Sequence, residues 1–219
     1  MKKSYLGLII LLILLTTYTP GINSFFNLRL NIEKIIITNN SIIDEKTIKQ
    51  KLNFLYKKNL FFLNNNEIEE NLKDNTFIES FSIKKIYPNK LKIIIVEKKA
   101  IAILHNKKRI FYISDKGNLI DFKQIDSYKD LPIVFGSGKE FYSVYKNILN
   151  TKFPLKKIKY FYFFESGRWD FVMHDDKIIK LPVNDYSTSL RSFMNLRNDK
   201  KFNNYKIYDF RIKDQLILN

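Results

Sequence analysis

The start of the chain contains a long stretch without a charged side chain, and this stretch limits where the remaining residues can fold. Lys2 and Lys3 precede 25 uncharged residues, Ser4 to Leu28, and the next charge is Arg29. A continuous helix of that length would measure about 37 Å, more than the roughly 30 Å hydrocarbon core of a bilayer. Residues 1–28 are therefore expected to form a short cytoplasmic end and a transmembrane anchor. Its most apolar positions are Tyr5, Leu6, Leu8, Ile9, Ile10, Leu11, Leu12, Ile13, Leu14 and Leu15.

A cleaved signal peptide is the alternative interpretation, because signal peptides have an apolar region as short as this one. However, the small-x-small pattern of a cleavage site does not occur in Thr16–Asn23. Pro20-Gly21 is expected to end the helix or bend it. We therefore expect an uncleaved signal anchor. The basic N-terminus predicts that this end stays in the cytoplasm, with the bulk of the chain on the extracytoplasmic side.

The net charge of +16 allows two interpretations. A strongly basic chain is typical of proteins that bind nucleic acids or anionic lipids. Here the lysines are spread along the whole sequence, and Lys far outnumbers Arg, the residue that bidentate phosphate and base contacts favour. We attribute the charge to a bias in base composition, because Lys, Ile, Asn and Phe, which all have AT-rich codons, dominate the sequence. We therefore expect no nucleic-acid partner. Cysteine is absent, which excludes disulfides and thiolate metal sites.

The sequence pattern of residues 29–98 predicts a small domain whose elements follow the order strand, helix, helix, strand, strand. Alternation and turn residues indicate the strands, and apolar residues at helical spacing after Asp44 and after Asn64–Asn66 indicate the helices. The last two strands are expected to form a hairpin around Tyr87–Lys90. The expected elements are a strand at Leu30–Ile37, a helix with Ile48, Leu52 and Leu55 inward, a helix with Ile68 and Leu72 inward, and strands at Phe77–Ile86 and Leu91–Val96.

From residue 99 onward, short strands dominate. They predict an antiparallel β domain with one or two covering helices, near Lys139–Leu149 and from about Pro182–Asp185 to Arg197. The whole chain is thus expected to be of the α+β class. The expected strands are Ala100–Leu104, Arg109–Ser114, Asn118–Asp121, Ile133–Phe135, Leu155–Phe164, Arg168–Met173, Lys177–Leu181, Lys206–Phe210 and Gln215–Leu218.

Few residues suggest chemistry. The two histidines, His105 and His174, fall in predicted turns and lack the spacing of metal ligands. Gly136-Ser137-Gly138 resembles part of a phosphate-binding loop but lacks the first glycine and the Ser or Thr after the lysine, so a turn leading into a helix is favoured. The aromatic run Tyr160–Phe164 with Trp169 suggests base stacking or a sheet core, and core is favoured. We expect no metal, no cofactor and no enzymatic activity.

Nine short motifs follow one another along the chain. They are Ile35–Asn40, Asn59–Leu63, Tyr87–Glu97, Ile101-Ala102, Tyr112–Gly117, Leu131-Pro132, Arg168–Asp170, Lys180–Pro182 and Tyr208–Arg211. In this order they resemble the bacterial cell-division family FtsQ, called DivIB in Gram-positive bacteria. Two positions depart from the family pattern: Asn39 stands where the family has glycine, and Ala100 where it has proline.

The resemblance implies a POTRA-like domain at residues 29–98 and an FtsQ-type β domain at 99–219. It also implies a non-enzymatic divisome scaffold in the inner membrane, at the division septum, with the bulk of the chain in the periplasm and no small-molecule substrate. Such a scaffold recruits single-pass partners of the FtsB and FtsL type during septum formation, by strand addition at its last strand. The implied contact residues are Arg211, Ile212, Asp214, Gln215, Leu216, Ile217 and Leu218, with Ser187, Leu190, Arg191 and Met194 on the flanking helix.

Two other functions remain open from the residues alone. POTRA domains also occur in envelope assembly and secretion proteins, although those normally carry a barrel or repeated POTRA units. A cationic module that binds an envelope polymer or a nucleic acid would also fit the net charge, and its binding would weaken with salt.

Overall fold

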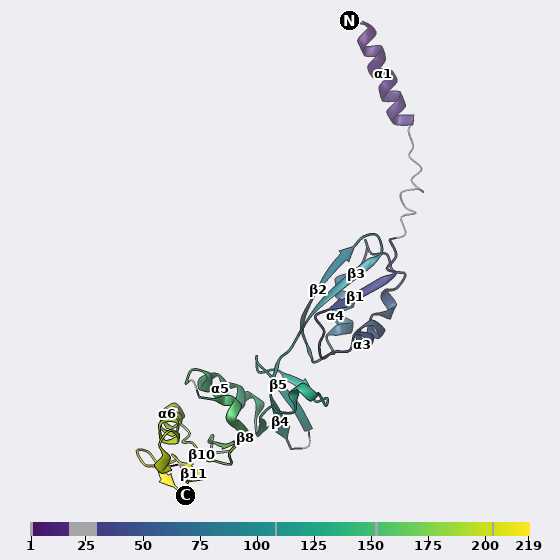
Figure 1. Ribbon diagram of the computed structural model, residues 1–219. Helices are drawn as coiled ribbons and strands as arrows, with labels where there is room; N and C mark the ends of the chain where they lie inside the picture. The colour runs from purple at the N-terminus through teal and green to yellow at the C-terminus, as the bar shows by residue number, and fades with distance from the viewer. Residues whose placement is uncertain (1, 18–29, 108, 152, 203) are drawn as a thin grey trace. The chain divides into compact units, whose positions relative to one another are not determined.

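A computed structural model describes residues 2–17, 30–107, 109–151, 153–202 and 204–219 (Figure 1). The chain divides into two compact units. Unit 1 consists of Met1–Asp74 and Ser80–Val96, and unit 2 consists of Asn75–Glu79 and Glu97–Asn219.

The N-terminal helix α1 spans Lys2–Thr17. Its side chains from Leu8 to Leu15 are apolar and exposed. Within the described residues, no helix combines the length and the apolar character that crossing a membrane requires. The rest of the expected anchor, residues 18–28 with Pro20-Gly21, lies outside the described residues.

Unit 1 has the predicted order of strand, helix, helix, strand and strand. Its sheet has the order β1-β3-β2, in which β1 and β3 run parallel. Helices α3 and α4 precede the hairpin of β2 and β3, and a short 3-10 helix, η1, follows α3. The bounds are β1 Lys34–Thr38, α3 Glu45–Lys51, η1 Asn53–Leu55, α4 Asn65–Leu72, β2 Ile78–Ile86 and β3 Lys90–Glu97.

Local sequence accounts for these helices. The Asp44 carboxylate accepts a hydrogen bond from the Thr47 amide, and the Asn64 side chain accepts one from Asn66, so both helices have a polar N-cap. Asn39 adopts a left-handed backbone with a φ of 65°, as its place in the turn predicts. The five side chains that were predicted to point inward are all buried: Ile48, Leu52, Leu55, Ile68 and Leu72.

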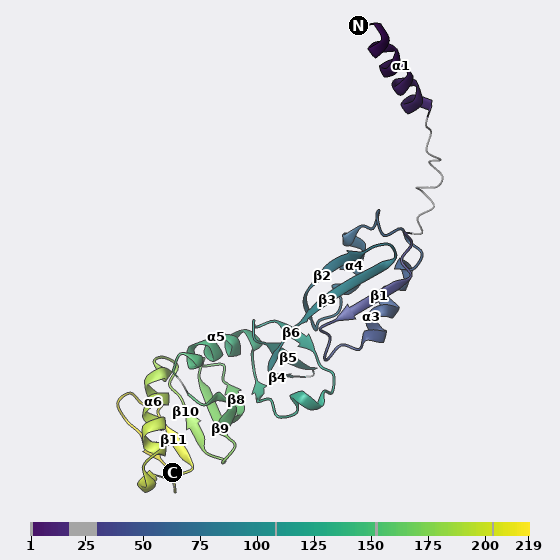
Figure 2. The ribbon, with the colours of Figure 1, turned by 45° about the horizontal axis from the view of Figure 1, so that its top comes forward.

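Unit 2 contains a nine-stranded sheet with the order β12-β11-β10-β9-β8-β7-β4-β5-β6. Figure 2 shows α5 beside β8 and α6 beside β10 and β11. The strands are β4 Ala100–Asn106, β5 Arg109–Ser114, β6 Leu119–Asp121, β7 Ile133–Phe135, β8 Ile158–Phe163, β9 Trp169–Met173, β10 Ile178–Lys180, β11 Ile207–Asp209 and β12 Ile217–Leu218. The helices are α5 Gly138–Leu149 and α6 Tyr186–Arg197, with 3-10 turns η2 Asp126–Tyr128, η3 Leu155–Lys157 and η4 Lys200–Phe202.

The prediction of an antiparallel sheet is wrong for three of its strand pairs. Strand pairs β4–β7, β7–β8 and β10–β11 are parallel, and the other pairs are antiparallel. Two of the parallel pairs follow from the helices, because α5 connects β7 to β8 and α6 connects β10 to β11. A strand that returns through a helix enters the sheet in its original direction. The sheet is therefore mixed.

The core of unit 2 lies between one face of this sheet and the two helices. Phe141, Val144 and Ile148 of α5, and Leu190 and Phe193 of α6, pack with alternate residues of the strands. Phe161 and Trp169 belong to this core, as expected for the aromatic run, whereas Tyr160 and Tyr162 are only half-buried.

The first strand, predicted at Leu30–Ile37, begins only at Lys34 in the structure, and three predictions for unit 2 also differ. Leu155–Lys157 forms the 3-10 turn η3 instead of the beginning of a strand. His105 lies inside β4 rather than in a turn, and its ring makes an edge contact with Phe135 at 5.3 Å. The last strand has only two residues, because Gln215 donates its amide to the Ile212 carbonyl in a turn and not to the sheet.

Candidate functional site at the carboxyl-terminal edge

Strand β12 is the outermost strand at one edge of the unit 2 sheet, and its register determines which backbone groups face outward. Ile207 and Asn219 exchange two hydrogen bonds, with N···O distances of 2.8 and 3.1 Å. In an antiparallel pair such residues alternate with residues whose backbone groups point away from the partner strand. Leu218, opposite Tyr208, is therefore a residue of the second kind. Its N–H and C=O point toward the open edge, whereas those of Ile217 pair with Asp209.

The side chains of β12 divide between the two faces of the sheet. Leu216 and Leu218 are half-buried and pack against the core between the sheet and the helices. Ile217 points to the opposite face, where its side chain is 44% exposed. The edge thus offers one outward-facing backbone residue and one exposed apolar side chain, the two features that an added strand requires.

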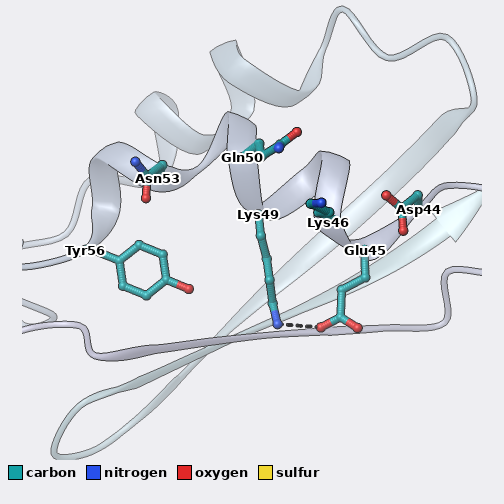
Figure 3. A pocket seen from close by; sticks show the side chains of 7 residues that line it. All are labelled: Asp44, Glu45, Lys46, Lys49, Gln50, Asn53 and Tyr56. Carbon is teal, nitrogen blue, oxygen red and sulfur yellow. Dashed lines mark ion pairs between the residues drawn. The ribbon is translucent and has the colours of Figure 1, made fainter.

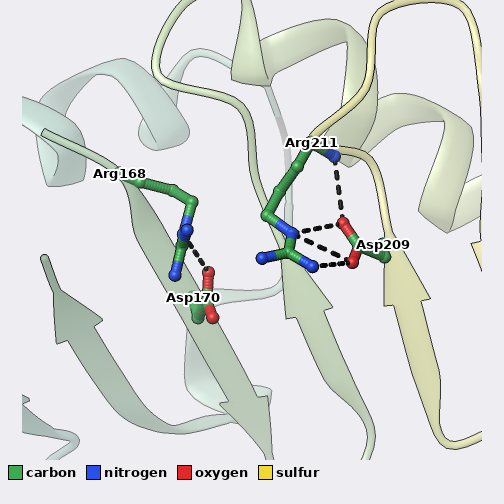
Figure 4. Close-up of polar contacts among 4 residues, drawn as sticks. All are labelled: Arg168, Asp170, Asp209 and Arg211. Carbon is green, nitrogen blue, oxygen red and sulfur yellow. Dashed lines mark hydrogen bonds and ion pairs between the residues drawn. The ribbon is translucent and has the colours of Figure 1, made fainter. Parts of the chain in front are cut away.

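Arg211 is held by its own chain (Figure 4). Its Nε lies 2.8 Å from Oδ1 and 2.9 Å from Oδ2 of Asp209, its Nη2 lies 2.5 Å from Oδ2, and its amide also donates to Oδ1. Asp209 is only 7% exposed. The side-chain hydrogen bonds from Arg211 lower the pKa of Asp209 from its ordinary value. The Arg211 guanidinium is thus fixed in place before any partner arrives.

A second carboxylate lies in the same cross-strand row. The register aligns Asp170 of β9, Lys180 of β10 and Asp209 of β11, so these side chains share the face opposite the helices. The Arg168 Nε donates to Asp170 Oδ1 at 3.1 Å. Burial raises the pKa of Asp170, and the charges of Arg168, Lys180 and Arg211 oppose this effect. This row of charged residues ends at Ile217, which lies opposite Asp209.

The remaining predicted contact residues differ in how far they reach solvent. Ile212 and Asp214 are exposed in the turn between β11 and β12, where Asp214 has a positive φ of 56°. On α6, Arg191 is exposed and Met194 is half-buried, as is Ser187. Leu190 is completely buried in the core, so its part in any contact can only be to support the helix.

Sequence reasoning did not single out Arg168, Asp170, Lys180 or Asp209 as site residues. All four were recognised only as members of the motifs Arg168–Asp170, Lys180–Pro182 and Tyr208–Arg211. Their alignment depends on strand register and on the parallel pairing of β10 with β11, neither of which a single sequence gives. The signal that was available is the repeated pattern of an Asp two residues from an Arg, in Arg168–Asp170 and Asp209–Arg211.

Unit 1 contains a shallow, open depression along α3 (Figure 3). The Nζ of Lys49 lies 2.7 Å from Oε1 of Glu45, one helical turn earlier, and this hydrogen bond raises the pKa of Lys49. Such a pair stabilises an exposed helix. The depression is lined by Asp44, Glu45, Lys46, Lys49, Gln50, Asn53 and Tyr56.

Two further candidates from the sequence have structural roles or remain at the surface. The Ser137 hydroxyl accepts from the Glu140 amide and caps α5, so Gly136-Ser137-Gly138 is the predicted turn into a helix. His174 lies in an exposed turn, as predicted. Across the described residues, no group of three His, Cys, Asp or Glu side chains is placed to hold a metal ion.

Comparison with known proteins agrees with the motif order. The family model for the FtsQ-type POTRA domain matches residues 30–98. The cell division protein FtsQ of Rickettsia felis is 30% identical over 233 residues, covering 98% of this chain and 87% of that protein. The cell division protein DivIB of Clostridium tetani is 25% identical over 186 residues, covering 84% of this chain and 63% of that protein.

A solved structure is also similar. The major extracytoplasmic domain of DivIB from Geobacillus stearothermophilus is 16% identical with a TM-score of 0.34, covering 47% of this chain and 92% of that chain. Membership rests on the sequence matches, which extend over nearly the whole chain and confirm the resemblance that the motifs indicated. The chain therefore belongs to the FtsQ/DivIB family of bacterial cell-division proteins.

Proposed function

We propose that the chain is a non-enzymatic scaffold of the division machinery, anchored in the inner membrane by residues 1–28. In this proposal residues 29–98 are the POTRA domain and residues 99–219 the β domain, both in the periplasm at the septum. Family membership supports the division role, and the match to residues 30–98 supports the POTRA assignment. The exposed apolar side chains of α1 and the uncharged sequence up to Leu28 support the anchor.

The working surface in this proposal is the edge at β12, where a partner of the FtsB or FtsL type adds a strand. The observation that carries it is the outward direction of the Leu218 N–H and C=O, which an incoming strand can pair with. The Asp209–Arg211 pair lies beside this edge. Since Nε and Nη2 of Arg211 already bind Asp209, an acidic partner side chain would approach Nη1.

The exposed face of β12 supplies a direct test. Ile217→Glu places a charge on the edge without touching the core, because Ile217 is exposed. Leu119→Glu is the matched control, because Leu119 is 46% exposed on β6 at the opposite edge of the same sheet. In a binding titration of the full chain with an FtsB-type partner, we expect Ile217→Glu to weaken binding at least about tenfold, a difference of about 1.4 kcal/mol. Leu119→Glu should bind as the unmodified chain does.

Two results would contradict the proposal. Ile217→Glu could bind with unchanged affinity, which would place the contact elsewhere, or both variants could lose binding equally, which would show a general effect of charge. Circular dichroism of each variant establishes that the fold is retained. Location is tested separately with a fluorescent fusion: a band at midcell supports the division role, and an even rim argues against it.

A further inference from the structure

Two adjacent aromatic side chains of unit 1 point into solvent. Phe61 is 61% exposed and Phe62 is 77% exposed, and their rings contact each other edge to face with centroids 5.2 Å apart. They lie between Leu60 and Leu63, both of which are buried. Leu60 and Leu63 thus attach the loop to the domain, whereas the rings of Phe61 and Phe62 project into solvent. Exposed apolar patches of this kind mark interaction surfaces.

Several hydrogen bonds hold the loop in place. The two rings are therefore exposed on an ordered loop. The Asn59 side chain accepts from the Phe61 amide at 2.9 Å. The Lys85 Nζ donates to the carbonyls of Phe61 and Leu63 at 3.1 and 3.3 Å. The Leu60 amide donates to the Leu30 carbonyl at 2.7 Å. The aromatic pair is therefore fixed both to β2 and to the segment before β1.

This loop lies where the chain from the proposed anchor joins the domain. Asn59 forms an isolated antiparallel β-bridge with Asn31. The hydrogen bond from the Leu60 amide to the Leu30 carbonyl attaches the loop to the first described residue of the domain. Leu30 follows the end of α1 at Thr17 by 13 residues. Even fully extended, that length spans at most about 45 Å, and the proposed anchor of residues 1–28 ends only two residues before Leu30, so this end of the domain is the one attached next to the membrane in the proposed function.

The segments around the loop are basic. Residues 30–34, 57–63 and 84–90 contain six lysines and one acidic residue, Glu33. The Glu33 carboxylate accepts from the Asn89 side chain, and Glu67, outside these segments, forms an ion pair with Lys58. The turn between β2 and β3 adds a further exposed aromatic ring, Tyr87. Aromatic side chains within a basic surface are the combination that favours the interface of an anionic membrane.

We propose that Phe61 and Phe62 dock into the headgroup region of an anionic lipid bilayer, and so hold the POTRA end of the chain against the membrane. The inference rests on the proposed anchoring by residues 1–28. The lysines attract the anionic headgroups, and the two rings enter the region between headgroups and acyl chains. The partner is a lipid surface rather than a protein, because covalent connection to the anchor brings this loop to the membrane.

The absence of cysteine makes a site-specific probe straightforward. The full chain carrying Asn65→Cys, next to the loop, is labelled with a fluorophore and reconstituted into vesicles of phosphatidylglycerol and phosphatidylcholine that contain headgroup-level nitroxide lipid. A probe at Lys46→Cys is the positional control, because Lys46 is exposed and follows the end of β1 that is distant from Leu30. We expect the probe at position 65 to be quenched at least about twofold more than the probe at position 46.

Three comparisons decide the inference. Adding Phe61→Ser and Phe62→Ser should abolish the extra quenching, whereas Leu149→Ser, at an exposed apolar residue of α5, should leave it unchanged. Equal quenching at positions 65 and 46, or quenching that survives the double change, would overturn docking. If the extra quenching at position 65 is as strong in vesicles of pure phosphatidylcholine as in vesicles with phosphatidylglycerol, the preference for anionic lipid is wrong.

Flotation of the vesicles separates this inference from the proposed anchor. A chain that does not float with the vesicles overturns the anchor, and with it this inference. A chain that floats but shows no extra quenching overturns the docking alone.

Discussion

Arg211 and Asp209 form a bidentate pair within a single turn of chain, with Nη2···Oδ2 at 2.5 Å and Nε···Oδ1 at 2.8 Å. The pair connects the end of β11 to the turn that leads to β12. Its geometry suggests that Arg211 first serves to order that turn, and only its remaining Nη1 is available to a partner. The pair therefore stabilises the β12 edge, and in the proposed function it also influences how that edge is recognised.

Asp209→Asn is expected to lower the free energy of unfolding of unit 2 by about 1 kcal/mol at neutral pH, because the ion pair with Arg211 is lost and the amide can accept through only one oxygen. The folded pKa of Asp209 lies below its ordinary value of 3.8. Its contribution is therefore fully present above that ordinary value and is lost as the pH falls through the folded pKa. Urea titrations at pH 7 and pH 3 measure this. A difference between variant and unmodified chain that persists undiminished at pH 3 would contradict it.

Asp170→Asn is expected to act with the opposite sign. Burial raises the pKa of Asp170 above 3.8, so the folded chain holds a proton there more tightly than the unfolded chain. In the pH range between the unfolded and folded pKa values of Asp170, stability falls as the pH rises. The amide avoids the cost of ionising a buried carboxylate and still accepts from Arg168. We expect an increase of up to about 1 kcal/mol at pH 7 in the same titrations, and a decrease would show that the Arg168 ion pair outweighs burial.

Proline substitutions distinguish the two residues of β12. Leu218→Pro removes an N–H that points to the open edge, so the hydrogen bonds of the sheet should be kept and stability should fall only through the lost packing of the Leu218 side chain, while partner binding weakens at least about tenfold. Ile217→Pro removes an N–H that pairs with Asp209, and should lower the free energy of unfolding by roughly 1–3 kcal/mol. Thermal unfolding and a binding titration separate these effects. Leu218→Val, which keeps the N–H, is the control, and equal loss of binding by both Leu218 variants would point to the side chain instead.

Two neighbouring residues of α6 should behave differently. Leu190→Ala removes a completely buried side chain from the core and should cost about 2–5 kcal/mol in the free energy of unfolding. Arg191→Ala, at an exposed position, should change it by less than about 0.5 kcal/mol. The Arg191 variant is therefore the appropriate test of a helix contact with the partner. Comparable destabilisation by both would show that α6 is less firmly packed than the structure indicates.

Local patterns predicted unit 1 well, because its signals lie within a few residues of one another. Asp44 and Asn64 cap the helices, and Asn39 takes the left-handed turn, as the sequence indicated. Strand direction in unit 2 was not predictable in this way. Whether β7 runs parallel to β4 depends on a contact between Ile103 and Ile133, far apart in the chain. The row of Asp170, Lys180 and Asp209 also depends on strand register, here of β9, β10 and β11, so the sequence indicated Arg211 beside the row as a contact residue but none of its three members.

The three residues of β7 have a consequence for cooperativity. On one side of β7 lies the meander β6-β5-β4, on the other the larger group β8 to β12, and β7 is paired in parallel with both. Each group can form much of its pairing between strands close in sequence, but their union requires Ile133–Phe135 and the α5 side chains packed over them. This junction decides whether the nine strands open as one cooperative unit or as two separate foldons.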